Sequence, residues 1–378
     1  MAEQLLIYAD TVRSPEMRHE IPLTVPDPFL YVEANGDRHV LAHTMELARM
    51  GDLGVQLHPL EELDIDELIR SGRTLLEIVR ELSLRACRRL GITDAVVPFG
   101  FPVDLADHLR ANGVQLQSDR DFFADRRRAK NRFELEGIRR AQAAAEGGME
   151  AARELLSRAE PNGDGLALDG EALSVERVKA VMDRVFVDHG TASEDFIVAP
   201  GAQGAVGHEM GYGPIRANEP LVIDIWPRDR TSACFADMTR TFVVGEPAAE
   251  IAEWHTFVHE ALDRCIAAIR PGVTGREIHD IACDVFEEHG QPTGRTKEPG
   301  KPLRDGFFHG LGHGVGLEVH EEPGMGMVGQ KPLVAGDVVT VEPGLYRQGF
   351  GGVRLEDLVL VTDDGAENLT RFSYDLAP

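Results

Sequence analysis

The sequence predicts a mixed α/β (α+β) chain with a small α/β domain over residues 1–130 and a larger domain over residues 131–378. Three observations support this prediction. The chain has 378 residues, more than a single hydrophobic core usually serves. Strand and helix patterns alternate through the first domain, as in compact α/β units. The second region contains two segments, 100 residues apart, that resemble each other.

Runs of apolar residues in the first domain predict strands over residues 4–9, 29–34, 38–42, 94–98 and 114–117. The Asn35-Gly36 pair predicts a hairpin turn between the second and third strands, because both residues tolerate positive φ. Helical spacing predicts a helix that ends before Gly91, and another over residues 103–109. No cluster of metal ligands stands out here, so we expect this domain to serve packing, oligomerisation or closure over a site built elsewhere.

A short basic segment, residues 126–131, interrupts the acidic trend and predicts the domain boundary. We expect a solvated linker there, with phosphate binding as the alternative. Residues 133–158 favour a long helix with a broad apolar face, which would open the second domain. Thr274 and Glu277 have capping-box spacing and mark the start of a later helix.

Two predicted helix ends in the second domain repeat one motif. Residues 185–190 read Val-Phe-Val-Asp-His-Gly, and residues 285–290 read Val-Phe-Glu-Glu-His-Gly. Each motif leads into a glycine-rich segment with histidine, which holds His208 in the first case and His309 and His313 in the second. A structural repeat would place two related halves across a cleft that both segments line, with coincidence as the alternative.

The composition narrows the classes of partner. A formal net charge of −25, from 64 acidic and 39 basic residues, opposes binding to nucleic acid or to anionic lipid. The four cysteines stand far apart, so we expect buried thiols of a reducing compartment and no thiolate zinc site. The N-terminal residues lack a basic region followed by an apolar core, and no long apolar run occurs. We therefore expect a cytoplasmic protein without a membrane segment.

Residues 307–323 concentrate three histidines, His309, His313 and His320, between closely spaced glycines. Glycine at such spacing weakens both helix and strand, so the stretch is suited to shaping a site. Imidazole is the commonest metal ligand and the usual acid or base near neutral pH. The alternative is a loop in which the three histidines are simply hydrogen-bonded.

Four carboxylates interrupt predicted sheet strands. Asp224 and Asp237 lie on two strands that we expect to pair antiparallel, Glu342 ends a third, and Glu356 lies within a fourth. An ionised carboxylate inside a sheet is costly unless it is paired, hydrogen-bonded or metal-bound. The alternative for the first two pairs Asp237 with Arg240 and leaves Asp224 at a strand edge.

Together with one histidine of the glycine-rich stretch, the carboxylates provide five hard or borderline ligands and no thiolate. Such a set suits a pair of divalent ions, for example manganese, cobalt or zinc, better than a closed structural zinc site. Two ions can share bridging carboxylates and activate a water molecule between them near neutral pH.

From about residue 132 to the end, the chain resembles the pita-bread-fold metallopeptidases, family M24. The resemblance is carried by Asp224 and by the segments 237–241 (Asp-Met-Thr-Arg-Thr), 312–321, 340–344 (Thr-Val-Glu-Pro-Gly) and 353–357. It is strongest to the Xaa-Pro peptidase branch, meaning prolidase and aminopeptidase P. The first domain resembles, more weakly, the creatinase-like smaller domain of that branch. The resemblance implies a catalytic domain with pseudo-twofold halves around a mainly antiparallel sheet.

Residue by residue, the resemblance implies that Asp237 and Glu356 bridge two metal ions and that Asp224 completes one site. His313 and Glu342 complete the other. Glu342 is also implied to accept a proton as a metal-bridging hydroxide attacks the scissile carbonyl, and to pass it to the departing nitrogen.

Four further residues match substrate-facing positions of the family. His320 is implied to stabilise the developing oxyanion, and His208 to contact substrate near the leaving group. His309 is implied to line the same pocket, with a structural role as the alternative. Arg354 is implied to orient a carboxylate, belonging either to the substrate or to a metal ligand.

The implied function is hydrolysis of the bond between an N-terminal residue and a following proline, in dipeptides or short peptides. A cytoplasmic homodimer with manganese is implied, with cobalt or zinc as other possible metals. Asp224 and Asp237 lie 13 residues apart, two more than is usual in the family. Two extra residues keep the facing of both strands but alter the hairpin tip, which bears on substrate preference. The alternatives are a metal-independent, creatinase-like amidinohydrolase and a non-catalytic peptide-binding module of this fold.

Overall fold

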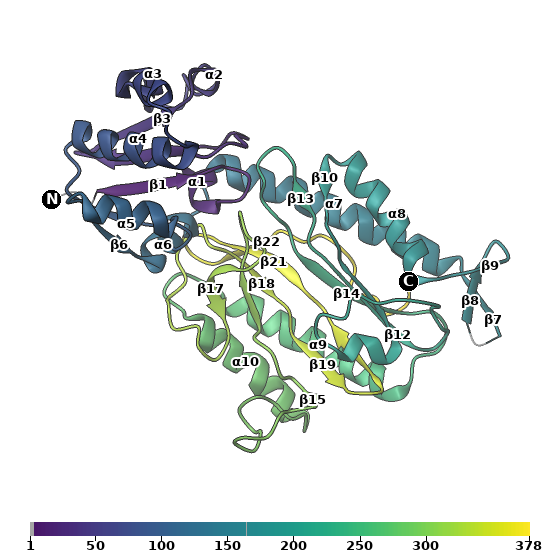
Figure 1. Ribbon diagram of the computed structural model, residues 1–378. Helices are drawn as coiled ribbons and strands as arrows, with labels where there is room; N and C mark the ends of the chain where they lie inside the picture. The colour runs from purple at the N-terminus through teal and green to yellow at the C-terminus, as the bar shows by residue number, and fades with distance from the viewer. Residues whose placement is uncertain (1–3, 164) are drawn as a thin grey trace. The chain divides into compact units, whose positions relative to one another are not determined.

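The computed structural model describes residues 4–163 and 165–378. The chain divides into two compact units, Met1–Arg127 and Arg128–Pro378 (Figure 1). Within the described residues, no helix is both long enough and apolar enough to cross a membrane.

A six-stranded sheet forms the centre of the first unit, in the spatial order β4-β3-β2-β1-β5-β6. Its strands are β1 (Leu5–Ala9), β2 (Phe29–Ala34), β3 (Asp37–Ala42), β4 (Gln56–Pro59), β5 (Asp94–Val97) and β6 (Gln115–Ser118). The helices are α1 (Pro15–Glu20), α2 (Thr44–Leu47), α3 (Ile65–Arg70), α4 (Leu75–Leu90), α5 (Val103–Ala111) and α6 (Arg120–Arg128). All the predicted elements are present, and Asn35 and Gly36 turn the β2–β3 hairpin with φ of 55° and 88°. The sequence patterns missed β4 and α1 to α3, which are too short to show a period, and α6, whose nine residues include four arginines and only three apolar residues.

The basic segment 126–131 is not the solvated linker that we expected. The buried Arg128 guanidinium donates to both carboxylate oxygens of Asp337, at 3.0 and 2.6 Å. Lys130 Nζ lies 2.6 Å from Glu321 Oε1, and both of these side chains are buried. These acidic partners lie 209 and 191 residues further along the chain, so the local sequence gave no sign of them.

The second unit is built from antiparallel strands and two pairs of helices. Its helices are α7 (Arg132–Ser157), α8 (Val175–Asp188), α9 (Ala249–Ala268) and α10 (Gly275–Glu288). Three strands form one sheet in the order β11 (Ile197–Pro200), β12 (Pro220–Ile225) and β14 (Met238–Val243). Five form another, in the order β17 (Glu321–Met325), β16 (Gly312–Gly314), β18 (Val338–Val341), β21 (Asp357–Val361) and β22 (Ala366–Asn368). A third contains β15 (Asp305–Gly306), β19 (Gly344–Arg347) and β20 (Gly351–Arg354). Smaller pairings involve β7 (Glu160–Asn162), β8 (Gly165–Leu168), β9 (Glu171–Ala172), β10 (Thr191–Ala192) and β13 (Arg228–Asp229).

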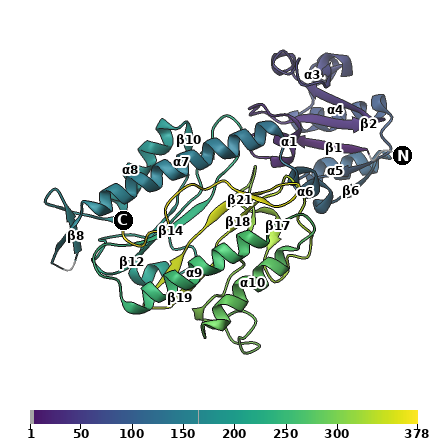
Figure 2. The same cartoon turned by 180° about the vertical axis from the view of Figure 1, so that it is seen from behind.

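The repeated motif of the sequence corresponds to two equivalent helices. α8 and α10 begin and end 100 residues apart, after the N-caps Ser174 and Thr274, and each is followed by a glycine with φ of 72°. The predicted capping box of Thr274 and Glu277 is present. α8 packs against α7 and β11, whereas α10 packs against α9 and β17. Figures 1 and 2 show these helix pairs on the two halves of the unit, with the strands between them.

Candidate active site

The second unit contains a cavity of about 770 Å³. It brings together all nine residues that the sequence singled out, namely Asp224, Asp237, His313, Glu342, Glu356, His320, His208, His309 and Arg354. Aromatic side chains form part of the same wall, among them Trp226, Phe308 and Tyr346.

Strands β12 and β14 bring the first two carboxylates to the cavity. They pair antiparallel as predicted, with Asp224 opposite Thr239, and Asp237 directly precedes β14. The alternative pairing is wrong, because Arg240 binds Asp357 at 2.9 Å and β12 is the central strand of its sheet. The longer hairpin therefore leaves both aspartates facing the cavity, as its even number of extra residues requires.

Glu342 directly follows β18, as predicted, whereas Glu356 lies between β20 and β21 and not within a single strand, as we had expected. Threonine hydroxyls hold both carboxylates. Thr239 Oγ1 donates to Glu356 Oε2 at 2.6 Å, and Thr340 Oγ1 lies 3.5 Å from Glu342 Oε1. Thr340 Oγ1 also accepts the backbone N–H of His313 at 3.1 Å. Thr239 is two residues from Asp237 and lies opposite Asp224, and Thr340 is two residues from Glu342. Because side chains alternate along a strand, each threonine lies on the same face as these carboxylates.

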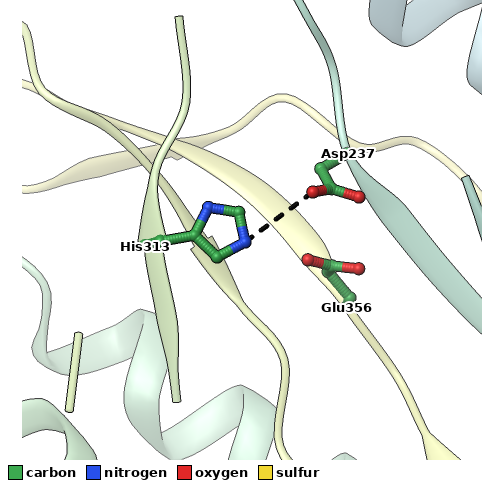
Figure 3. Close-up of side chains that lie close together, drawn as sticks. All are labelled: Asp237, His313 and Glu356. Atoms are coloured by element: carbon green, nitrogen blue, oxygen red, sulfur yellow. Dashed lines mark ion pairs between the residues drawn. The ribbon is translucent and has the colours of Figure 1, made fainter. Parts of the chain in front are cut away.

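Three ligand-type side chains converge closely (Figure 3). Asp237, His313 and Glu356 each offer one ligand atom within 4.8 Å of the others, and His313 Nε2 lies 3.8 Å from Asp237 Oδ2. Glu342 Oε1 lies 3.4 Å from the same nitrogen. Asp237 Oδ1 is buried and has no hydrogen-bond partner among the described residues. An unsatisfied buried carboxylate oxygen among oxygen and imidazole donors fits a divalent cation.

The carboxylates of the cavity disfavour one another's charge. Burial, followed by repulsion from Glu356, Asp224 and Glu342, raises the pKa of Asp237 well above its usual range. Burial and the charges of Glu342 and Asp224 do the same to the pKa of Glu356. Burial raises the pKa of Glu342 to about 8, with a further contribution from Asp224 and opposition from Arg354. Divalent cations would relieve this repulsion, which is a second sign that the residues fit metal.

Two histidines of the cavity, His309 and His313, are held neutral. Burial, and secondarily the positive charge of Arg354, lowers the pKa of His309 to about 3. Burial, and secondarily His320, lowers the pKa of His313 to about 4. Neutral imidazole is the form that binds metal, so His313 is ready to act as a ligand at neutral pH.

These pKa values predict that the metal-free protein loses stability as the pH rises from 6.5 to 8. Glu342 keeps its proton in the fold up to a pKa of about 8, whereas the unfolded carboxyl has lost it. Stability therefore falls by roughly 2 kcal/mol for one such proton across this window. His309 and His313 act in the opposite direction, because the unfolded imidazoles take up protons, but only below about pH 6.5.

Thermal unfolding of chelator-treated protein between pH 6.5 and 8 measures this effect. The Glu342→Gln variant is the matched control, because it keeps the shape of the side chain and removes the titration. We expect its stability to change less over the window than that of the parent. An equally steep decline in both proteins would assign the effect to groups other than Glu342, such as Asp237 and Glu356.

Tyr346 is a cavity residue that the sequence patterns missed. Its hydroxyl accepts from Arg354 Nη1 at 3.0 Å and lies 2.9 Å from His309 Nε2. Arg354 Nη2 in turn donates to Asp224 Oδ2 at 2.6 Å. Tyr346 lies four residues after Glu342 on the next strand, where period-two facing could have suggested it. The guanidinium thus binds a predicted metal ligand directly, which favours the second of the two roles considered for Arg354.

Comparison with known proteins agrees with this geometry. The sequence model of the family described as metallopeptidase family M24 matches residues 136–363. The Xaa-Pro dipeptidase of Pyrococcus furiosus is 31% identical over 274 residues, which cover 71% of this chain and 70% of that protein. The probable dipeptidase PepE of Mycobacterium tuberculosis is 32% identical over 287 residues, which cover 75% of this chain and 68% of that protein.

Solved structures share the fold over nearly the whole chain. The prolidase of Pyrococcus horikoshii OT3 superposes with a TM-score of 0.75 at 24% identity, covering 99% of this chain and 95% of that one. The Xaa-Pro dipeptidase of Bacillus anthracis superposes with a TM-score of 0.77 at 23% identity, covering 99% and 94%. The expected pita-bread architecture, with its mainly antiparallel second unit, is confirmed. The chain belongs to metallopeptidase family M24, in its Xaa-Pro peptidase branch.

Proposed function

We propose that this peptidase hydrolyses the bond between an N-terminal residue and a following proline, in dipeptides or short peptides. The observation that carries the proposal is the convergence of Asp224, Asp237, His313, Glu342 and Glu356 on one cavity. The similarity to Xaa-Pro dipeptidases of two Pyrococcus species supports the preference for proline.

The five convergent side chains are proposed to hold two divalent ions. Asp237 and Glu356 would contribute to both sites, Asp224 would complete one of them, and His313 and Glu342 would complete the other. When bound, the ions supply an activated water near neutral pH and neutralise the charge that develops on the substrate. Manganese is the first choice, with cobalt and zinc as alternatives, because the donors are oxygen and imidazole without thiolate.

Glu342 is proposed to move the proton. It accepts a proton from the attacking water and delivers it to the nitrogen that leaves. Its place in the cavity, with Oε1 3.4 Å from His313 Nε2, supports this role.

The remaining side chains are proposed to bind and orient the substrate. His320 donates to the developing oxyanion, His208 contacts the substrate near the leaving group, and His309 lines the pocket. Arg354 acts through its hydrogen bonds to Asp224 and Tyr346, which fix the carboxylate on one side of the cavity.

A peptide panel tests the proposed specificity. Gly-Pro, Ala-Pro and tripeptides with proline second are compared with matched peptides that carry alanine second, after loading with manganese, cobalt or zinc. We expect kcat/KM to favour proline by at least about tenfold, as a site shaped for one side chain allows. Equal rates on both series would contradict the proline preference, and turnover of amidines alone would favour the creatinase-like alternative. The ratio of dipeptide to tripeptide turnover decides between dipeptidase and aminopeptidase.

We also propose that the enzyme works as a homodimer in the cytoplasm. The resemblance to the Xaa-Pro peptidases supports the dimer, and four free, buried cysteines suit a reducing compartment. Sedimentation of the purified protein tests the dimer, and a mass equal to one chain would contradict it.

A further inference from the structure

A buried ion pair holds one end of the loop 315–320, which joins β16 to β17 and carries His320. Lys130 Nζ lies 2.6 Å from Glu321 Oε1, and the two side chains are only 2% and 3% exposed. Lys130 Nζ also donates to the backbone oxygen of Arg128 at 3.3 Å, and the Lys130 N–H donates to Gly336 O at 3.1 Å. Lys130 is therefore held by the backbone of Arg128 and Gly336 in addition to its ion pair with Glu321.

Glu321 is the residue that follows His320, and it ties the loop in two directions. Its Oε1 binds Lys130, while its Oε2 accepts the backbone N–H of Glu318 at 3.4 Å. The start of the loop is held as well, because Gly316 O accepts the N–H of Phe235 at 2.8 Å. Phe235 is two residues before Asp237, so the same loop is anchored next to a proposed metal ligand.

The ion pair also lies close to the backbone of Gly316. A Cβ at Gly316 would lie 2.6 Å from Glu321 Oε1 and 2.8 Å from Lys130 Cε. Both distances are shorter than real Cβ contacts, so a side chain at residue 316 would require the ends of the Glu321 and Lys130 side chains to move. Gly316, at the start of the loop, thus packs directly against the Lys130–Glu321 ion pair.

His320 itself depends on its backbone for its direction. Its ring lies edge-on to the ring of His313, with centroids 4.1 Å apart. Within residues 4–163 and 165–378, no hydrogen bond to the His320 imidazole is found. The anchored backbone on either side of His320 and the packing against His313 therefore set the position of the ring in the cavity.

We propose that Lys130 and Glu321 are positioning residues that act through His320. Their ion pair holds the loop so that the imidazole lies where the oxyanion develops. The inference rests on the proposed function of His320 as the oxyanion donor. A displacement of about 1 Å in a catalytic group can cost two orders of magnitude in rate, so the pair matters although it does not touch substrate.

The first test compares two buried ion pairs of the same segment. Lys130→Met is made alone and with Glu321→Gln, because the double variant leaves no unpaired buried carboxylate. We expect both to lower kcat by about 10- to 100-fold with KM changed less than about threefold. Arg128→Met is the matched control, since its pair with Asp337 is comparably buried, with side chains 8% and 0% exposed. We expect it to lower the melting temperature and to leave kcat within about threefold of the parent.

The decisive test repeats Lys130→Met in a His320→Ala background. A residue that acts through His320 has nothing left to position there, so we expect no further loss of kcat. Multiplicative losses, or an equal fall of kcat in Arg128→Met, would overturn the proposal. The cycle is measured on the best substrate of the peptide panel. A substrate without proline would therefore contradict the proposed specificity and still test the ion pair.

Discussion

Asp237→Asn is expected to abolish metal binding at the shared position and to lower kcat/KM by at least about three orders of magnitude. Metal ions contribute several kcal/mol of charge stabilisation to such reactions, and about 1.4 kcal/mol corresponds to a tenfold change in rate. Asp237 Oδ1 is a buried carboxylate oxygen without a hydrogen-bond partner in the part of the chain that the structure describes. An asparagine keeps the shape but offers one neutral oxygen, which cannot bridge two cations.

Elemental analysis and peptide hydrolysis on the same preparation measure the effect. Asp229→Asn is the matched control, because Asp229 is a buried aspartate of the same hairpin that binds Arg140 and does not line the cavity. We expect this control to lose thermal stability and to keep its metal. Full activity in an Asp237→Asn protein without metal would contradict the proposed metal-dependent mechanism.

Glu342→Gln is expected to lower kcat by about 10²- to 10⁴-fold, the range that general acid–base catalysis usually contributes. The variant keeps an oxygen near His313 Nε2, which lies 3.4 Å from Glu342 Oε1. We therefore expect it to bind substrate with a nearly unchanged KM. We also expect the pH profile of kcat to lose the limb that reports this carboxyl.

Glu367→Gln controls for the change of charge, because the half-buried Glu367 lies on β22 of the same sheet and pairs with Arg139 away from the cavity. Its turnover and pH profile should match those of the parent enzyme. Retention of more than about a tenth of the parent kcat in Glu342→Gln would remove Glu342 from the proton path.

The sequence predicted the elements and the convergence of the site where local patterns were strong. The Asn35-Gly36 hairpin, the capping box at Thr274 and the pairing of the strands around Asp224 all follow from neighbouring residues. The cavity residues were predictable because buried carboxylates and a glycine-rich histidine loop are conspicuous in any sequence. The resemblance then connected motifs that lie far apart along the chain.

The missed features all depend on contacts over long distances in sequence. Lys130 was expected to be solvated, yet its partner Glu321 lies 191 residues away. Tyr346 was missed because one tyrosine on a strand carries no local sign that Arg354 and His309 will meet its hydroxyl. In both cases, segments distant in the sequence remove the side chain from water and supply its partner. The amino-acid composition does not reveal such contacts.

The altered hairpin tip between Asp224 and Asp237 has one visible consequence. Trp226 directly follows β12, which ends at Ile225, and its side chain lines the cavity two residues after Asp224. A large aromatic side chain at this position reduces the space beside the site, so the hairpin bears on which peptides fit.

Anomalous diffraction from crystals loaded with manganese tests the central claim most directly. The account predicts two peaks within the cavity, both in contact with Asp237 and Glu356, one also near Asp224 and the other near His313 and Glu342. Asp224 is expected to remain bound to Arg354 while it contacts the first ion, since each of its two oxygens can serve one partner. A single peak, or peaks outside these five side chains, would contradict the two-metal site.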